Sequence, residues 1–345
     1  MKDRIIDAGL SFFRATGLDR AASFLTRGQG AILMFHNVRP ATPRAYAPNQ
    51  PLEVTPEFLE TTIELLRRLE YEIIPVGDLV TRLSRNDGGR FAAVTFDDGY
   101  RDNLEVAAPI LKRHAIPYTI YVTTGFVNRN SRLWWLELEA AIASLDHVDM
   151  VIGGDRFSAS ARTPEEKCRA YVGAYAFLRN HDEPAMLDCI STLLDKSGAR
   201  SDFVQLCMTW DEVRTAAQDP LCTIGAHTLT HARLTKYDDT SVRRELLESR
   251  EMIEREIGRP VVHLAYPFGD SLSAGPREFA IALECGYHTA VTTRPGVLFS
   301  DHREHMTALP RLAVHGGWQN SRSLESLLTG APFALWNLGR RINVS

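Results

Sequence analysis

Two stretches of the sequence carry carboxylates and imidazoles at spacings that suit metal-assisted hydrolysis, and the first is Asp97-Asp98-Gly99. An apolar, β-prone run at residues 91–96 leads directly into the two carboxylates, and the glycine then breaks the run. Adjacent carboxylates repel each other when both are ionised, so a neighbouring positive charge must compensate them, and a divalent metal is the simplest source. An isolated Asp-Asp-Gly is also typical of a turn that caps a helix, so residues elsewhere in the chain must decide.

The second stretch contains His227 and His231, which follow another apolar run at residues 221–226. Side chains four residues apart, on a first helical turn or on a loop leaving a strand, can face one ion. This spacing alone is a weak indication of a metal site. Together with the Asp-Asp turn, however, two imidazoles and one carboxylate predict a three-ligand site for zinc or another first-row divalent ion, with open positions for water and substrate.

Both stretches need strands that end on the same side of a sheet. Apolar runs predict strands at residues 31–36, 73–76, 91–96, 118–123, 221–226, 261–266, 289–292 and 309–314, with helices at 56–69, 76–83, 103–115, 210–217 and 240–257. This alternation predicts an α/β fold with a parallel sheet and helices outside it, either open or closed as a barrel. Parallel strands gather their carboxyl ends on one face, where active sites are built.

The alternation is interrupted between residues 125 and 208. Helical patterns near residues 136–145, 165–179 and 184–196 predict a mainly helical insertion, placed at 126–208. We therefore expect an N-terminal amphipathic helix at 1–28, a main domain at 29–318 that holds this insertion, and a C-terminal helical tail at 319–345.

The composition of the 345 residues is that of an ordinary globular protein, and the net charge of −4 gives no reason to expect a nucleic-acid partner. Five cysteines without a C-x-x-C pair indicate free thiols in a reducing compartment. Charged residues interrupt the N-terminal apolar pattern, which therefore predicts neither a signal peptide nor a membrane span. The amphipathic helix either packs on the domain or makes peripheral contact with a membrane. Because the cysteines indicate a reducing compartment and no export signal is predicted, the expected location is the cytoplasm or the cytoplasmic face of a membrane.

Three motifs carry a resemblance to a known family. Thr95-Phe96-Asp97-Asp98-Gly99-Tyr100 and the segment from His227 to His231 resemble the first two motifs of the polysaccharide deacetylases, the NodB-homology domain of carbohydrate esterase family four. Tyr266-Pro267-Phe268-Gly269 is similar to the third motif of that family. The resemblance covers about residues 33–314 without the insertion, and it implies a distorted (β/α)7 barrel.

The resemblance also implies a mechanism. Asp98, His227 and His231 would hold a divalent metal, either zinc or one of cobalt, nickel, manganese and iron(II), and Asp97 would be the general base. The metal and a backbone N–H near Phe268 would stabilise the oxyanion. The implied reaction is hydrolysis of N-acetyl groups on amino sugars of a polysaccharide, such as an exopolysaccharide, or of a glycan precursor, with release of acetate. Residues expected beside the substrate are Tyr100, Tyr266, Pro267 and Phe268.

Two departures from the family pattern leave alternatives open. The arginine that commonly pairs with the base is absent before Pro267, and Arg311 either replaces it or is an ordinary surface cation. The general acid is either His36, which ends the first strand as in circularly permuted exopolysaccharide-type members, or His315 near the end of the last strand; we favour His36. Both could instead be structural histidines.

Two other functions remain open on the sequence. One is a C–N hydrolase of a small amide or cyclic imide on the same barrel, and the other is a catalytically silent carbohydrate-binding protein. The sequence does not predict the sugar or the oligomeric state.

Overall fold

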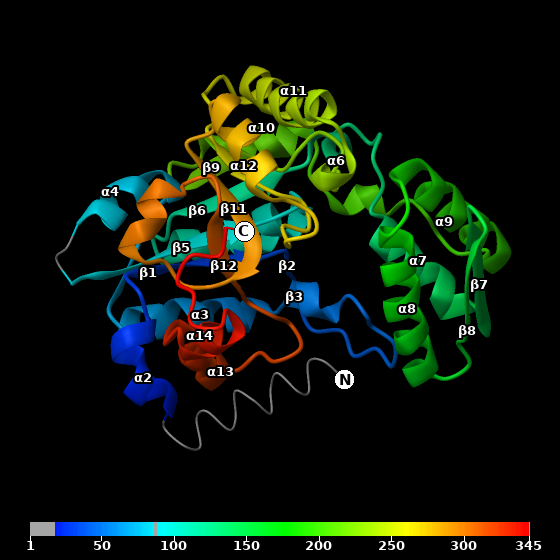
Figure 1. Cartoon of the computed structure of the whole chain (residues 1–345), viewed down its shortest axis with the longest axis horizontal. Helices are drawn as coiled ribbons and strands as arrows, with labels where there is room; N and C mark the ends of the chain where they lie inside the picture. Colours follow the sequence, from blue (N-terminus) through cyan, green and yellow to red (C-terminus); the bar gives the residue numbers. More distant parts are fainter. Residues whose placement is uncertain (1–17, 86–87, 345) are drawn as a thin grey trace. The chain divides into compact units, whose positions relative to one another are not determined.

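The computed structural model describes residues 18–85 and 88–344 (Figure 1). Within this part the chain forms two compact units. The first contains the described residues up to Pro40 together with Leu52–Asn128 and the chain from Cys207 onward, and the second contains Ala41–Pro51 and Arg129–Leu206. No helix of the described residues is both long and apolar enough to cross a membrane.

A closed barrel of seven parallel strands forms the centre of the first unit. Its strands pair in the order β1 (Gly30–Phe35), β5 (Arg90–Phe96), β6 (Tyr118–Val122), β9 (Cys222–Ala226), β10 (His263–Ala265), β11 (Thr289–Pro295) and β12 (Leu309–Ala313). The barrel closes because β1 pairs in parallel with both β5 and β12. An eighth strand, β4 (Tyr71–Ile73), pairs with the first residues of β5. The predicted (β/α)7 barrel is therefore confirmed, and the sheet is not open.

Neighbouring residues of the barrel strands β1 and β5 belong to two separate cores. Ile32 and Ala93 pack in the core inside the barrel, whereas their neighbours Leu33 and Val94 pack in the larger core between the barrel and its helices. Because both faces are buried, these strands appear in the sequence as continuous apolar runs rather than as alternating ones.

Helices surround the barrel (Figure 1). They are α2 (Leu18–Thr26), α3 (Pro56–Arg68), α4 (Leu79–Ser84), α5 (Ala108–Arg113), α6 (Thr124–Val127), α10 (Trp210–Gln218), α11 (Asp239–Ile257), α12 (Pro276–Glu284), α13 (Ser321–Leu328) and α14 (Ala331–Trp336), with one π-helical turn, η3 (Asn103–Ala107). Shorter elements are β2 (Asn37–Val38), β3 (Glu53–Val54) and the 3₁₀ turns η1 (Gln50–Leu52), η2 (Val76–Asp78), η5 (Leu234–Lys236) and η6 (Ser300–Glu304).

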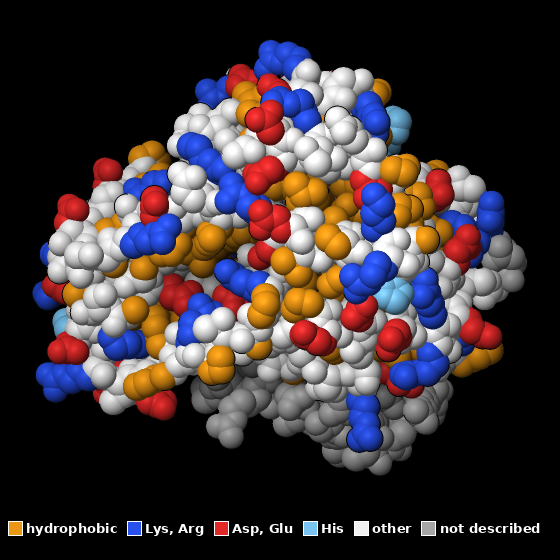
Figure 2. Space-filling view, turned by 180° about the vertical axis from the view of Figure 1, so that it is seen from behind, with side chains coloured by type: hydrophobic (Ala, Val, Ile, Leu, Met, Phe, Trp, Pro, Cys, Tyr) orange, Lys and Arg blue, Asp and Glu red, His pale blue; other side chains and the backbone are white. Residues whose placement is uncertain are grey.

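Helices lie in the described parts of both terminal segments. The tail predicted at 319–345 contains α13 and α14, and the helix predicted at 1–28 contains α2. Residues 1–17 of that predicted helix lie outside the described residues. On the face drawn in Figure 2, acidic and basic side chains are interspersed among apolar ones, as on an ordinary water-facing surface.

The second unit contains the three helices expected for the insertion and a β-hairpin that was not predicted. The helices are α7 (Trp134–Ser144), α8 (Pro164–Arg179) and α9 (Glu183–Ser197), followed by the 3₁₀ turn η4 (Phe203–Leu206). β7 (His147–Ile152) and β8 (Asp155–Ser160) pair antiparallel around Gly153 and Gly154, whose φ angles of 58° and 94° suit a tight hairpin turn. The Gly-Gly turn was the sequence signal for this hairpin.

Candidate metal centre and active site

Strand pairing sets the functional residues at one end of the barrel. Phe35 of β1 pairs with Phe96 of β5, and the Asp97 amide donates to the Phe35 carbonyl at 3.0 Å. His36 and Asp97 thus leave adjacent strands at the same level. Because side chains alternate along a strand, Asp97 points inward like Ala93, which lies four residues earlier. Arg311 points inward in the same way, like the buried Leu309 of β12.

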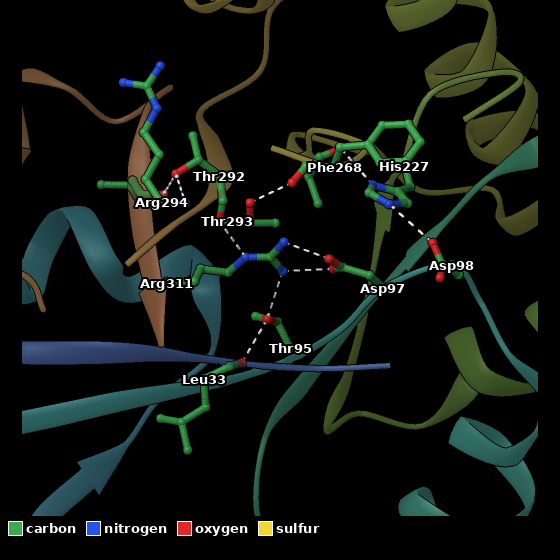
Figure 3. Close-up of polar contacts among 12 residues, drawn as sticks. Leu33, Thr95, Asp97, Asp98, His227, Phe268, Thr292, Thr293, Arg294 and Arg311 are labelled. Atoms are coloured by element: carbon green, nitrogen blue, oxygen red, sulfur yellow. Dashed lines mark hydrogen bonds and ion pairs between the residues drawn. The ribbon is translucent and has the colours of Figure 1, made fainter. Parts of the chain in front are cut away.

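Asp98, His227 and His231 converge as the sequence predicted for metal ligands. The Nε2 atoms of both histidines lie 3.3 Å from Oδ1 of Asp98, and all three side chains are buried. One ligand atom from each residue lies within 4.8 Å of the others. Figure 3 shows His227 facing Asp98 at the mouth of the barrel.

The hydrogen bonding of His227 tests whether this group fits a metal. Its Nδ1 lies 2.7 Å from the Ala265 carbonyl, which can only accept, so Nδ1 carries the hydrogen and donates. The lone pair of Nε2 then faces the Asp98 carboxylate. Two acceptors this close need a cation or a proton between them, and two imidazoles with one carboxylate are a donor set that suits zinc and similar ions. The residues therefore fit a divalent metal.

The electrostatics of the pocket favour positive charge at His227. Burial lowers the pKa of His227, but its contact with Asp98 and the charge of Asp97 more than reverse this, so that its pKa lies above the ordinary value. Burial would raise the pKa of Asp98, yet its contacts with the His227 and His231 imidazoles hold the pKa far below the ordinary value. Asp98 is therefore ionised and available as a ligand.

The backbone around these residues is strained. Asp98, Thr228, His231 and Phe268 have φ angles of 70°, 63°, 66° and 60°, which is the left-handed region that residues other than glycine rarely adopt. Such conformations cost about 1–3 kcal/mol each and persist where the surrounding structure enforces them, typically at functional sites.

Glu245 of α11 holds the loop between the two histidines, and the sequence analysis missed it. Its carboxylate is buried and accepts hydrogen bonds from the Leu229 amide at 3.0 Å, the Thr230 amide at 2.9 Å and the Thr230 hydroxyl at 2.9 Å. The sequence gives no signal for this role, because Glu245 is one of several acidic residues on a charged helix.

Arg311 lies against Asp97 inside the barrel. Its Nη1 and Nη2 donate to the two carboxylate oxygens at 2.7 and 2.6 Å, and its Nε donates to the Thr292 carbonyl at 2.8 Å (Figure 3). Only 1% of Arg311 is exposed, so this residue is not a surface cation. Burial would raise the pKa of Asp97, but the Arg311 guanidinium outweighs it and holds the pKa below the ordinary value.

The two candidate general acids have different surroundings. His36 is half-buried, and the charges of Asp98, Asp97, Arg311 and His227 all act on its pKa, which burial lowers overall. His315 follows the neighbouring strand β12, where its ring stacks on Trp318 with centroids 5.0 Å apart and its Nδ1 accepts from the Gly317 amide at 3.0 Å. The described contacts thus place His36 within the electrostatic field of the site.

The four residues expected beside the substrate occupy two kinds of position. Tyr100, Tyr266 and Pro267 are buried, and the Tyr266 hydroxyl donates to the Thr307 carbonyl at 2.9 Å. Phe268 is half-buried, and its ring centroid lies 4.9 Å from that of His231. Phe268 therefore forms part of the wall beside the metal ligands, whereas the buried side chains support this region from inside.

Comparison with known proteins adds a family and a fold. A family model described as polysaccharide deacetylase matches residues 84–290. No curated protein sequence matches the chain. Among solved structures, a deacetylase from Streptococcus pyogenes in complex with acetate is similar, with 18% identity, coverage of 86% of this chain and 97% of that chain, and a TM-score of 0.57.

Two further structures share the fold. A polysaccharide deacetylase from Bacillus cereus has 17% identity and a TM-score of 0.56, and the match covers 87% of this chain and 68% of that chain. A de-N-acetylase from Aggregatibacter actinomycetemcomitans has 14% identity, with coverage of 86% and 99% and a TM-score of 0.53. At these identities the similarity supports the barrel fold and no more.

We expect zinc to stabilise the protein through the three converging side chains. A ligand at about one hundred times its dissociation constant adds about 2.7 kcal/mol to the free energy of unfolding, which raises the melting temperature by several degrees. Asp98→Asn and His231→Ala should lose both this increase and the one bound metal per chain found by elemental analysis. His147→Ala, at an exposed hairpin position, is the control and should keep both. An equal increase in the Asp98 variant would contradict the assignment.

We expect Arg311→Met to destabilise the fold by about 3–5 kcal/mol, because it leaves the Asp97 carboxylate buried without its partner. Adding Asp97→Asn should restore part of this loss in a double-mutant cycle measured by urea unfolding. Arg156→Met, which breaks the exposed pair with Asp149, is the control and should cost less than about 1 kcal/mol. Similar losses for the two single arginine variants would show that the buried pair contributes little.

Proposed function

Because the chain belongs to the polysaccharide deacetylase family, we propose that it hydrolyses N-acetyl groups on amino sugars of a polysaccharide or glycan precursor and releases acetate. Family membership and the deacetylases that share its fold support deacetylation of glycans. The observation that carries the proposal is the Asp97–Arg311 pair beside the Asp98, His227 and His231 group at the mouth of the barrel.

In this proposal Asp98, His227 and His231 hold a divalent metal, for which zinc is our first choice and cobalt, nickel, manganese or iron(II) are alternatives. Such a metal, when bound, would supply a Lewis acid that polarises the acetyl carbonyl and acidifies water. The Ala265 carbonyl fixes the orientation of the His227 ring, and so the direction of its Nε2 atom.

The residues of the chain then move the protons. Asp97, kept ionised and oriented by Arg311, takes a proton from the attacking water as the water oxygen bonds to the carbonyl carbon of the acetyl group. A backbone N–H near Phe268 stabilises the resulting oxyanion. His36 gives a proton to the sugar nitrogen as the C–N bond breaks, so that acetate and a free amino sugar leave. The Phe268 ring, next to His231, borders the acetyl group.

The site supports this function over a catalytically silent carbohydrate-binding protein for a physical reason. A carbohydrate-binding module gains nothing from a buried carboxylate that an arginine holds ionised beside three metal-ligating side chains, because that arrangement carries a desolvation cost. A small-amide hydrolase would use the same groups, so only the substrate distinguishes it.

The first test is acetate release from N-acetylated oligosaccharides of increasing length, with the enzyme reloaded with zinc or cobalt. Asp97→Asn should abolish release, because the base is lost while its volume is kept. His36→Ala should lower kcat by about 10²–10⁴-fold, the usual contribution of a general acid. His315→Ala is the matched control and should lose far less. No acetate from any glycan, despite one metal per chain, would favour the small-amide hydrolase, and a larger loss in His315→Ala would reverse the assignment of the acid.

We also propose that the chain contacts a membrane surface through its N-terminal helical region. In the described residues, α14 lies beside α2 and extends the same face of the protein. Leu25 of α2 lines one groove together with residues that follow or belong to α14, among them Phe333 and Arg340. The two helices lie side by side (Figure 1), and the Thr26 hydroxyl donates to the Thr329 carbonyl at 2.7 Å. The surface is thus continuous across both helices.

Exposed apolar and basic side chains gather on this surface. More than half of each side chain is exposed at Phe24, Leu25, Leu335, Trp336 and Leu338. Arg27, Arg340 and Arg341 are exposed as well, and the sequence contains no acidic residue at 326–345. An apolar surface with tryptophan and arginine and without acidic groups suits the interface of an anionic bilayer.

We expect the full chain to co-sediment with vesicles that contain phosphatidylglycerol, more weakly with phosphatidylcholine alone, and less in high salt. Trp336→Ser with Leu338→Ser should weaken binding by about tenfold or more, because it removes two buried apolar contacts with the lipid. The matched control is Leu272→Ser with Leu283→Ser, two leucines exposed elsewhere. Absence of binding to every vesicle, or the same loss in the control, would contradict the proposal.

A further inference from the structure

The segment that carries His36 is held by side chains from the helical segment that follows the Asp97-Asp98 turn. Asn103, the first residue of η3, is fully buried, and its Nδ2 donates to the His36 carbonyl at 2.6 Å. The two residues are 67 positions apart in the sequence. This contact lies just beyond the ladder between β1 and β5, which ends at Phe35 and Phe96.

Asp102 completes the contact from the next position. Its Oδ1 accepts hydrogen bonds from the Val38 amide at 3.2 Å and from Nδ2 of Asn103 at 3.1 Å. Asp102 and Asn103 together therefore bind the carbonyl of His36 and the amide of Val38, on the two sides of Asn37. These hydrogen bonds link the backbone of the His36 segment to the chain that follows Asp98.

The contact at Asp102 is costly, which argues against an incidental arrangement. Burial raises the pKa of Asp102 to about 7, because the Val38 hydrogen bond and the Arg39 charge offset only part of the desolvation. Arg39 in turn pairs with Glu53 at 3.0 Å, next to the short β2–β3 pairing. An apolar side chain would fill this space without that cost but would leave the Val38 amide without this acceptor.

We propose that Asn103 and Asp102 are positioning residues that fix His36 relative to Asp97 and Asp98. The inference rests on the proposed function, in which His36 protonates the leaving nitrogen. Strand pairing sets the levels of β1 and β5 only as far as Phe35 and Phe96. Beyond that point the hydrogen bonds of Asn103 and Asp102 set the path of the backbone at His36, and an error of about 1 Å in such a group can cost about a hundredfold in rate.

The test compares two substrates that differ in their need for an acid. An N-acetyl sugar must receive a proton on nitrogen as its C–N bond breaks. Hydrolysis of an aryl acetate instead releases a stable phenolate, which needs no proton from the enzyme. We expect Asn103→Ala to lower kcat on the N-acetyl sugar by about 10–100-fold with little change in KM, and to lower kcat on the ester at least several-fold less. Metal content should stay at one per chain.

Three further variants separate positioning from folding. Asp102→Asn keeps an oxygen that can accept hydrogen bonds from Val38 and Asn103, so its ratio of amide to ester rates should stay near that of the wild type. If Asn103→Ala does not fold, Asp102→Ala takes its place and is expected to lower this ratio, with Asp102→Asn as its conservative partner. Asn49→Ala removes a buried amide in the second unit, where it contacts Trp135 and Glu139, and is the matched control.

The outcomes distinguish this inference from the proposed function. Equal losses on amide and ester in Asn103→Ala, with normal wild-type acetate release, would overturn the positioning role alone. A wild-type enzyme that cleaves the ester but releases no acetate from any N-acetyl glycan would overturn the proposed function and, with it, this inference.

Discussion

The ion pair between Asp97 and Arg311 is the interaction on which the arrangement of the site depends. Two adjacent carboxylates at the end of a buried strand cannot both remain ionised without positive charge nearby. Arg311 supplies that charge to both oxygens of Asp97, at 2.6 and 2.7 Å, from the far end of the chain. A buried pair of this kind stabilises the fold little compared with apolar packing, but it is destabilising when one partner is removed. The pair therefore favours the folded arrangement in which Asp97 and Arg311 contact each other over arrangements that bury one of them alone.

This requirement is linked to closure of the barrel. Arg311 lies on β12 and Asp97 follows β5, and β1 pairs with both strands. The guanidinium spans the interior at the level where β1 ends, with further hydrogen bonds to the Thr292 carbonyl and to the Thr95 hydroxyl. Thr95 donates in turn to the Leu33 carbonyl of β1. An open sheet would place the ionised carboxylate and the guanidinium on different edges, so the polar interior and the closed topology support each other.

The sequence predicted the parts of this structure that depend on local pattern. The barrel strands were recognisable because burial on both faces produces continuous apolar runs, and the Asp-Asp and His-x-x-x-His segments were recognisable because their chemistry is local. The choice between pairing with Asp97 and a surface position for Arg311 needed the closed barrel. Glu245 and Asn103 were not predictable, since each acts on a loop that only the folded chain brings to it. The β7–β8 hairpin was missed because β8 is largely polar and has no buried residue, so it lacks the apolar run that marked the barrel strands, although its Gly-Gly turn is visible in the sequence.

The left-handed conformation of Asp98 explains how two neighbouring carboxylates serve different partners. Along a regular strand the side chains of Asp97 and Asp98 would point to opposite faces, and Asp98 would face the surrounding helices. With φ of 70° at Asp98 and 66° at Gly99, the chain turns at once, so that Asp98 faces His227 and His231 while Asp97 keeps its inward direction toward Arg311. Aspartate is one of the few residues with a side chain that visits this region readily, and glycine adopts it without strain. The Asp-Asp-Gly sequence is thus required by backbone geometry as well as by charge.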